Sequence, residues 1–533
     1  MATIREVTYE ILRQHGLTTF FGNPGSNELT FLDEMPADFR YILGLHEGAV
    51  LAMADGFAQA SGGPAFANLH SAAGTGHAVG ALTNSWYSHS PLVITAGQQV
   101  RSQVGTEATL SNVDAPSLPQ PLVKWSGEPL AASDAPRMIS QAIHTATTTP
   151  AGPVYVSIPL DDWRQEVDDG LVAELPARRV ETAGALSPAQ IEELAAVLDQ
   201  AQHPVLVLGP DVDATASNDQ AVALAEKLRA PAWIAPSASR CPFPTRHPAF
   251  RGVLPASITG ISAQLAGHDV ILVVGAPVFR YHQFDPGPYL PDDASLVHLT
   301  SDPAEAARAP MGRSVVVDVQ QALAALVDAI TQAERPMPEP RSSLSPPADH
   351  DATTPFAPEA VFSAVAATAP ADAIYVKEAT STTGVVWDHL DISRPGSYYF
   401  PAAGGLGFGL AAAVGVQLAQ PERPVIALIG DGSANYGITA LWTAAQYHLP
   451  VTFVILNNGT YAALRSFSNY MHVTDAPGID IPGIDFVRIA EGYGVSARAV
   501  KTSDELQDAL RRSLGSDEPH LIEVPTRPIE ALP

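Results

Sequence analysis

The sequence predicts an α/β protein of three domains, each a mostly parallel sheet flanked by helices. The chain has 533 residues, which corresponds to about three domains of ordinary size. Hydrophobic residues make up 46% and charged residues 16%, so large buried cores can form. Short apolar runs alternate with helical patterns along the chain, as is typical of parallel sheets covered by helices on both faces.

The first domain is expected over residues 1–180. Its buried strands are predicted at residues 19–21, 41–45, 65–69, 92–95 and 154–158, with helical patterns at 48–60 and from after Gly74 to about Ser85. Ser26, Glu47 and His70 each come just after a predicted strand. Because parallel strands end at a common edge, we expect these three side chains along one edge of the sheet.

Two segments of altered composition divide the rest of the chain. Residues 161–187 are charged and then lose their apolar periodicity, and residues 336–358 are rich in proline and serine, so both are predicted to be linkers. The middle domain is expected over residues 181–340, and the last domain over residues 341–533. Strands are predicted at 204–208, 270–274, 295–299 and 373–376.

The last domain contains the most informative pair of segments, Gly430-Asp431-Gly432-Ser433 and Asn457-Asn458-Gly459-Thr460. Each follows an apolar run, and a helical pattern at 438–448 separates them, which predicts two parallel strands joined by a crossover helix. Asp431 and Asn458 then lie at neighbouring strand ends. Either turn alone is common in α/β proteins. Together, a carboxylate, an amide oxygen and a glycine turn suit Mg²⁺ carrying a diphosphate.

Composition and missing motifs exclude several classes of function. The net charge of -27 repels phosphate backbones, so nucleic acid is not expected as a partner. Cys241 is the only cysteine, which excludes a disulfide framework and a cysteine-based zinc site. No apolar run is long enough to span a bilayer and the first residues do not form a signal peptide, so we expect a cytoplasmic protein with no membrane partner. Neither a phosphate-binding P-loop nor a dinucleotide-binding glycine motif is present.

Four residues are candidates for proton transfer and substrate contact. Glu47 is either a helix N-terminal acid or a carboxylate whose pKa is raised by an apolar pocket. His70 and His282 have the side chain best suited to proton transfer near neutrality, although the other 14 of the 16 histidines make a structural role an open alternative. Ser26 is either a helix N-cap or an anchor for a substrate carboxylate.

The pair of segments around Asp431 and Asn458 resembles the metal–diphosphate motif of thiamine diphosphate enzymes. Over its whole length the chain resembles the thiamine diphosphate-dependent 2-oxoacid decarboxylases, above all the branch that acts on benzoylformate. The segments that carry this resemblance are residues 21–29, 68–76, 279–283, 380–383 and 430–436. It implies decarboxylation of benzoylformate (phenylglyoxylate) to benzaldehyde and CO₂, with carboligation of aldehydes as a side activity. It also implies thiamine diphosphate and Mg²⁺ as cofactors, with Ca²⁺ able to replace Mg²⁺.

The resemblance assigns roles to individual residues. Glu47 activates the cofactor through its pyrimidine ring, and Ser26, His70 and His282 contact the substrate and move protons. The metal is held by Asp431, Asn458 and Thr460. The remaining cofactor-binding residues are Thr380, Ser381, Gly404, Leu406, Gly432, Ser433 and Tyr461. An apolar substrate pocket is formed by Pro24, Leu110, Ala463, Leu464 and Phe467. The resemblance also implies a homodimer or homotetramer whose sites lie between subunits, with a small 2-oxoacid and an aldehyde as ligands.

Three positions depart from the pattern of this branch: Thr109, Ala462 and Ser466. We expect them near the pocket mouth, so they leave the preferred side chain of the 2-oxoacid open. The alternatives are a benzaldehyde lyase, a different 2-oxoacid decarboxylase, an acetohydroxyacid synthase, or an inactive paralogue that serves as an interaction subunit. The absence of an adjacent His-His pair in the N-terminal third disfavours a pyruvate-type decarboxylase, and His70 disfavours a synthase. Retention of Glu47, Asp431 and Asn458 disfavours an inactive paralogue.

Overall fold

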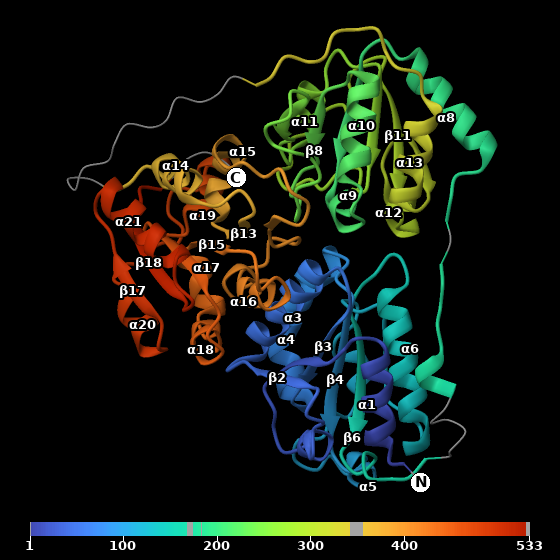
Figure 1. The fold of residues 1–533 in the computed structure, drawn as a ribbon, viewed down its shortest axis with the longest axis vertical. Coiled ribbons are helices and arrows are strands. Elements are labelled where there is room, and N and C mark those ends of the chain that lie inside the picture. Colours follow the sequence, from blue (N-terminus) through green and yellow to red (C-terminus); the bar gives the residue numbers. More distant parts are fainter. Residues whose placement is uncertain (1, 168–173, 183, 342–354, 529–533) are drawn as a thin grey trace.

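The chain forms three lobes, each built on one six-stranded parallel sheet (Figure 1). The computed structural model describes residues 2–167, 174–182, 184–341 and 355–528. The predicted fold class is confirmed. The strands fall at residues 19–159, 204–316 and 374–525, inside the three predicted domains, whose boundaries stay a prediction. Among the described helices, none is long and apolar enough to cross a membrane.

The N-terminal sheet has the strand order β2-β1-β3-β4-β6-β5. Its strands are β1 (Thr19–Gly22), β2 (Arg40–Leu43), β3 (Ala65–Leu69), β4 (Leu92–Gln98), β5 (Trp125–Gly127) and β6 (Val154–Pro159). The accompanying helices are α1 (Ile4–Gln14), α2 (Leu29–Leu32), α3 (Glu47–Ser61), α4 (Ser71–Tyr87), α5 (Arg101–Val104) and α6 (Ala135–Thr147).

The middle sheet has the order β12-β11-β10-β7-β8-β9. Its strands are β7 (Pro204–Leu208), β8 (Ala232–Ile234), β9 (Phe250–Val253), β10 (Val270–Val274), β11 (Ser295–Thr300) and β12 (Arg313–Val316). Its helices are α8 (Pro188–Gln200), α9 (Pro210–Ala214), α10 (Asn218–Leu228), α11 (Ile258–Gln264), α12 (Pro303–Arg308) and α13 (Val319–Ala329).

The C-terminal sheet has the order β14-β13-β15-β16-β18-β17. Its strands are β13 (Ile374–Glu378), β14 (Tyr398–Tyr399), β15 (Val425–Gly430), β16 (Val451–Asn457), β17 (Ser496–Ala499) and β18 (His520–Pro525). Its helices are α14 (Pro358–Thr368), α15 (Thr383–His389), α16 (Gly409–Ala419), α17 (Asp431–Gly437), α18 (Ala440–Gln446), α19 (Ala462–Tyr470), α20 (Phe486–Gly492) and α21 (Ser503–Leu514).

Burial on both faces explains why the central strands were recognisable as continuous apolar runs. Every residue of β15 from Val425 to Ile429 is fully buried, as expected for a parallel strand covered by helices on both sides. Short edge strands such as β14 and β17 carry no such signal and were not predicted. The helix expected at 438–448 is α18, and a separate helix, α17, begins at Asp431 itself. Within the linker expected at 336–358, residues 342–354 lie outside the described residues.

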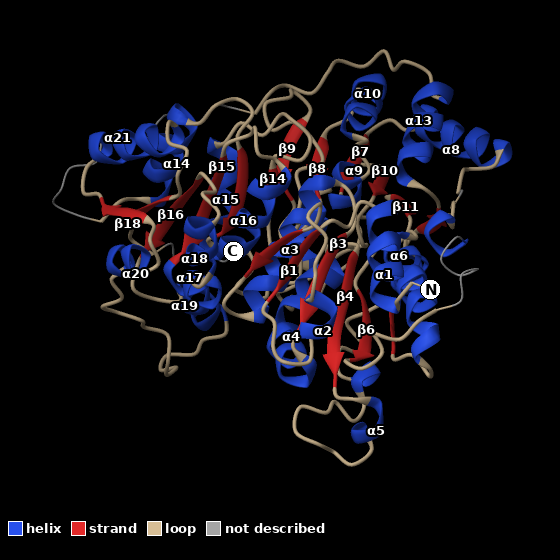
Figure 2. Cartoon of the chain, turned by 60° about the horizontal axis from the view of Figure 1, so that its bottom comes forward, coloured by secondary structure: helices blue, strands red, loops and turns tan. Residues whose placement is uncertain are grey.

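The N-terminal and C-terminal lobes are joined by the packing of α3 against α16, which lie side by side (Figure 2). A Cβ atom at Gly56 would lie 2.3 Å from the carbonyl oxygen of Ala412, and one at Gly415 would lie 1.9 Å from that of Met53. The backbones of the two helices therefore touch at glycine, and their apolar residues belong to one continuous core.

In each sheet the strand order reverses next to the first strand. The chain starts at β1, β7 or β13, builds outward to one side, and then returns to the other side at β3, β10 or β15. Such reversal points open a crevice at the carboxyl ends of the strands, where α/β proteins bind ligands.

Candidate active site

Asp431 and Asn458 lie at neighbouring strand ends, as predicted. β15 and β16 are parallel, with Gly430 opposite Leu456. The Asp431 carboxylate accepts hydrogen bonds from the backbone of Gly432 (2.9 Å), Asn458 (3.1 Å) and Gly459 (2.6 Å). Burial raises the pKa of Asp431, and these three N–H donors oppose the rise. The carboxylate therefore locks the two loops together.

The oxygen atoms around Asp431 suit a hard divalent cation. Asn458 Oδ1 accepts from Thr460 N (3.1 Å), and the Thr460 carbonyl accepts from Ala462 N (3.0 Å), so both oxygens are held in place. A carboxylate, an amide oxygen and a carbonyl form a set without sulfur or imidazole, which fits Mg²⁺ or Ca²⁺ and not zinc. The donor chemistry here is compatible with the expected metal and diphosphate.

A cavity of about 1430 Å³ opens beside this group. It lies between the middle and C-terminal lobes. Gly404 has a φ of +74°, and a Cβ atom added there would have no other atom within 4 Å, so this residue borders open space. All the predicted site residues of these two lobes line the cavity: His282, Thr380, Ser381, Gly404, Leu406, Asp431, Gly432, Ser433, Asn458, Thr460, Tyr461, Ala463, Leu464 and Phe467.

His282 and Phe467 meet inside this cavity. The exposed His282 ring lies 4.4 Å from the Phe467 ring, measured between centroids, and its backbone N–H donates to the Ala256 carbonyl (2.8 Å). Ser466, expected at the pocket mouth, is instead buried in α19, donates to the Ala462 carbonyl (3.2 Å) and does not line the cavity. Ala462 does line it, so only this departure touches the cavity directly.

A second group of predicted residues lies on the N-terminal lobe. Glu47 is the first residue of α3 and only 7% exposed. Its carboxylate is held by Asn23 Nδ2 (3.2 Å) and by His77 Nδ1 (3.0 Å). Neither Asn23 nor His77 was singled out from the sequence, although Asn23 lies in the segment that resembles the family.

His70 is oriented by a buried acid that the sequence analysis missed. Glu28 is 1% exposed, and its carboxylate accepts from the backbone of Gly25 (2.8 Å) and Gly97 (2.9 Å) and pairs with His70 Nδ1 (2.8 Å). When neutral, His70 therefore carries its proton on Nδ1, which leaves Nε2 as the free ring nitrogen. The available signals were the position of Glu28 near Ser26 and its place in the segment 21–29 that resembles the family.

Ser26 is not a helix cap. α2 begins at Leu29 with Glu28 at its N-cap position, so Ser26 lies exposed outside the helix and donates to Asn27 Oδ1 (3.3 Å). Pro24 is also exposed. Leu110 adopts a φ of +71° and accepts a hydrogen bond from Asn27 through its carbonyl (3.4 Å). Thr109 is exposed beside it.

One chain does not bring these two groups together. His70 directly precedes α4, whereas Tyr87 at the far end of α4 lines the large cavity. A helix of 17 residues is about 25 Å long, so His70 lies about that far from Tyr87. The described lining of the cavity contains neither Glu47, nor Ser26, nor His70.

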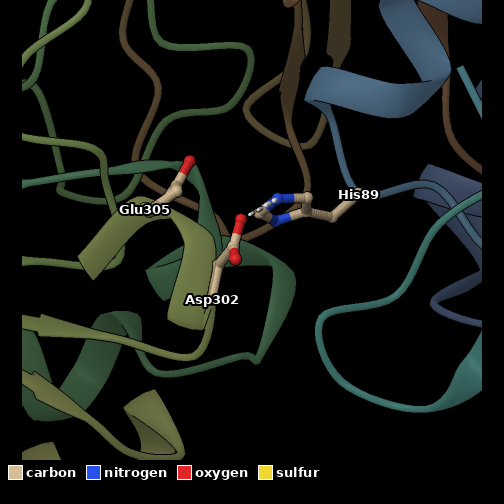
Figure 3. A group of neighbouring side chains, drawn as sticks. All are labelled: His89, Asp302 and Glu305. Atoms are coloured by element: carbon tan, nitrogen blue, oxygen red, sulfur yellow. Dashed lines mark ion pairs between the residues drawn. The ribbon is translucent and has the colours of Figure 1, made fainter. Parts of the chain in front are cut away.

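A separate polar cluster joins the N-terminal and middle lobes (Figure 3). One oxygen or nitrogen from each of His89, Asp302 and Glu305 lies within 4.8 Å of the others. Charges within the cluster already compensate one another, because His89 pairs with Asp211 (3.3 Å) and Asp302 (3.8 Å), and Glu305 pairs with Arg308 (3.2 Å) and Arg280 (3.9 Å). It is therefore an ion-pair network between lobes.

The pKa values in this network shift upward. Burial lowers the pKa of His89, but Asp211, Glu305 and Asp302 outweigh it, so the net pKa is raised. Burial raises the pKa of Glu305, and Asp211 adds to the rise.

The three lobes match known family models. Residues 2–118 match the N-terminal TPP binding domain of thiamine pyrophosphate enzymes, residues 191–326 match their central domain, and residues 378–524 match their C-terminal TPP binding domain. Thiamine pyrophosphate and thiamine diphosphate are the same compound.

Individual relatives match over nearly the whole chain. Benzoylformate decarboxylase of Pseudomonas aeruginosa is 63% identical, with 99% of this chain and 100% of the relative covered. The structure of a thiamine diphosphate-dependent 4-hydroxybenzoylformate decarboxylase from Rhodococcus jostii RHA1 superposes with a TM-score of 0.97 at 59% identity, covering 99% of this chain and 100% of the other. Benzoylformate decarboxylase from Polynucleobacter necessarius gives a TM-score of 0.96 at 37% identity, with 99% of each chain covered.

Proposed function

Because this chain belongs to the thiamine pyrophosphate enzyme family, we propose that it decarboxylates benzoylformate to benzaldehyde and CO₂, with thiamine diphosphate and Mg²⁺ bound. The observation that carries the proposal is the 63% identity to a benzoylformate decarboxylase over the full length. Three structural features support it. They are the group of oxygen atoms around Asp431 that suits a divalent metal, the contact between His282 and Phe467, and the buried Glu47 on the N-terminal lobe.

Asp431, Asn458 and Thr460 would hold Mg²⁺, and Thr380, Ser381, Gly432 and Ser433 would hold the diphosphate beside it. When bound, thiamine diphosphate supplies a nucleophilic thiazolium carbon and accepts the electrons released as CO₂ leaves. Glu47 would contact the pyrimidine ring of the cofactor, with its carboxyl group held in place by Asn23 and His77.

The substrate is bound by apolar and polar groups on opposite sides. Leu464 and Phe467 would cover the aryl ring and exclude water from it, which favours loss of the charged carboxylate. Ser26 would orient that carboxylate through its hydroxyl. His70 would move a proton through Nε2, since Glu28 occupies Nδ1. His282 would assist release of the aldehyde from the same cavity as Phe467.

Completing the site requires a second copy of the chain. Neither Glu47 nor His70 is among the described residues that line the Asp431 cavity, so we propose that the N-terminal lobe of one copy faces the C-terminal lobe of another. In a two-fold symmetric pair, both contacts form at once and two complete sites result.

The test is a substrate panel with thiamine diphosphate and Mg²⁺ that follows CO₂ release. Benzoylformate should be among the best substrates, and Glu47→Gln should lose most of the turnover. Pyruvate or a branched 2-oxoacid as the best substrate would overturn the aryl assignment but not the family.

A second candidate, 4-hydroxybenzoylformate, is favoured by the 59% identity to the Rhodococcus jostii enzyme. The same panel separates the two by the ratio of their kcat/KM values. A tenfold preference for the 4-hydroxy compound, worth about 1.4 kcal/mol, would assign that substrate instead.

A further inference from the structure

Lys377 is an unusual residue for this chain. Only four of the 29 basic residues are lysines, and Lys377, near the end of β13, is 0% exposed. Burying an ammonium group is unfavourable unless its charge or its donors are used. A fully buried lysine in a protein with so few lysines therefore indicates a specific role.

The ammonium group of Lys377 lies directly behind the cavity wall. Its Nζ donates to Thr383 Oγ1 (3.0 Å), and that hydroxyl donates to the Thr380 carbonyl (2.7 Å). Nζ also lies 5.0 Å from the centre of the Phe400 ring, within range of a cation–π contact. Thr380, Thr383 and Phe400 all line the cavity, whereas Lys377 does not.

This part of the wall adjoins the metal site. β13 and β15 are parallel neighbours with Glu378 opposite Ile429, and a Cβ atom at Gly430 would lie 3.7 Å from Ala379 Cα. A diphosphate bound through a metal at Asp431 therefore lies beside the turn of residues 380–383. The segments 380–384, 430–433 and 458–461 contain no lysine or arginine. Arg527 also lines the cavity but is exposed, so solvent screens its charge.

A competing role for Lys377 is to compensate its neighbour Glu378. That carboxylate is also fully buried and accepts from the backbone of Gly407 (2.8 Å), Phe408 (3.2 Å) and Gly409 (2.9 Å), which fixes the loop that carries Leu406. Burial lowers the pKa of Lys377 and raises that of Glu378, and the charge of each residue opposes the shift of the other. Successive side chains of a strand point to opposite faces, however, and the Lys377 ammonium donates to Thr383.

We propose that Lys377 is a further cofactor-binding residue, whose buried ammonium group stabilises the diphosphate through the cavity wall and fixes the turn of residues 380–383 through Thr383. The inference rests on the proposed function only in taking thiamine diphosphate and a metal at Asp431 as the cofactors.

The test compares cofactor affinities of the full-length protein after dialysis against a chelator. Thiamine diphosphate or thiamine monophosphate is titrated in with Mg²⁺ present, and tryptophan fluorescence is followed, since Trp387 lines the cavity. Lys377→Met keeps the length of the side chain and removes its charge. It should weaken binding of the diphosphate about tenfold and of the monophosphate less than about threefold, because the monophosphate carries less negative charge for the ammonium group to stabilise. Lys501→Met, an exposed lysine of the same lobe, is the matched control and should change neither affinity.

A double variant separates the two roles. If Lys377 only compensates Glu378, then Lys377→Met with Glu378→Gln restores diphosphate affinity, and the proposal is overturned. If it acts on the diphosphate, the loss persists. Equal losses for the two ligands would also overturn it. Thr383→Val leaves the charge in place and should weaken the binding of both thiamine diphosphate and thiamine monophosphate. Unchanged affinities in this variant would contradict the proposed role of Thr383 in fixing the turn of residues 380–383.

Folding and cofactor use are checked independently. Circular dichroism of each apo variant must match the parent, and Lys377→Gln provides the same comparison if Lys377→Met does not fold. If the parent protein fails to bind thiamine diphosphate, the proposed function is refuted. If the parent protein binds it and Lys377→Met binds it equally well, only the inference about Lys377 is refuted.

Discussion

In the C-terminal sheet the strand order reverses between β13 and β15, and in the middle sheet it reverses between β7 and β10. The first crevice opens on the large cavity and is bordered by Asp431, Gly432 and Thr380. The second is filled: Asp211, just after β7, pairs with His89 from the N-terminal lobe. The same topology therefore has two outcomes. In the C-terminal sheet, glycines and a hydrogen-bonded carboxylate leave a cavity for a ligand, and in the middle sheet an ion pair between acids and a histidine fills the crevice and connects two lobes.

The largest effect should come from the open crevice. Replacing Asp431 with alanine removes a proposed metal ligand and also the acceptor that ties the 457–459 loop to α17. We expect kcat/KM for benzoylformate to fall at least about 100-fold, with loss of Mg²⁺-dependent binding of thiamine diphosphate. Asp508→Asn, an exposed acid on α21, is the control and should leave both unchanged. Near-normal turnover in Asp431→Ala would place the metal elsewhere.

Mixing two inactive variants tests whether the open crevice is only half a site. Glu47→Ala and Asp431→Ala should each be nearly inactive, but subunits unfolded and refolded together should regain about a quarter of the parent activity. The reason is that half of randomly formed pairs are hybrids, and each hybrid has one site with both residues intact. A mixture as inactive as its components would mean that each chain builds its own site.

A smaller effect is expected at Glu28, which acts through His70. Glu28→Gln keeps the shape but weakens the bond to Nδ1, so His70 loses its fixed tautomer. We expect kcat to fall about tenfold with little change in KM, because the imidazole is no longer held in one tautomer and orientation. Glu107→Gln, exposed on the same lobe, should leave kcat unchanged. An unchanged kcat together with a lower free energy of unfolding would show that Glu28 acts on folding alone.

The smallest catalytic effect is expected at the filled crevice, where the change should appear in stability. His89 has a raised pKa in the folded protein, so its contribution is fully present below its ordinary pKa of about 6.5 and is lost as pH rises through the raised value. Ionising Glu305, whose pKa is also raised, acts in the same direction. His89→Gln should therefore lower the free energy of unfolding by about 2–3 kcal/mol near pH 6 and by less near pH 9, measured by denaturant titration.

The surface pair of His448 and Glu518 supplies the control for that measurement. His448→Gln should change stability by less than about 1 kcal/mol, since exposed ion pairs contribute little. A pH-independent loss in His89→Gln would mean that packing, and not charge, holds the joint.

What the sequence predicted well was local. Asp431 and Asn458 stand at the junctions of apolar runs and glycine turns, so their place at strand ends followed from neighbouring residues alone. Glu28 and His89 were missed because their partners are distant in the chain, and Lys377 was missed because no local pattern reveals that its side chain is buried. Ser466 was misplaced because residue spacing did not reveal which face of α19 borders the cavity. No local pattern joins His89 to Asp211 and Asp302, which come from another lobe.

The glycine contact between α3 and α16 determines how the halves of the site can move. Because backbone meets backbone at Gly56 and Gly415, no side chain separates the helices at these two positions, and sliding them past each other would force backbone atoms together. The pair works as a spacer of fixed length between Glu47, at the start of α3, and the loop of Leu406 that precedes α16. In an assembled pair of chains, a displacement at one site would be carried along this spacer to the other. The two sites would then be mechanically linked although no ligand touches both.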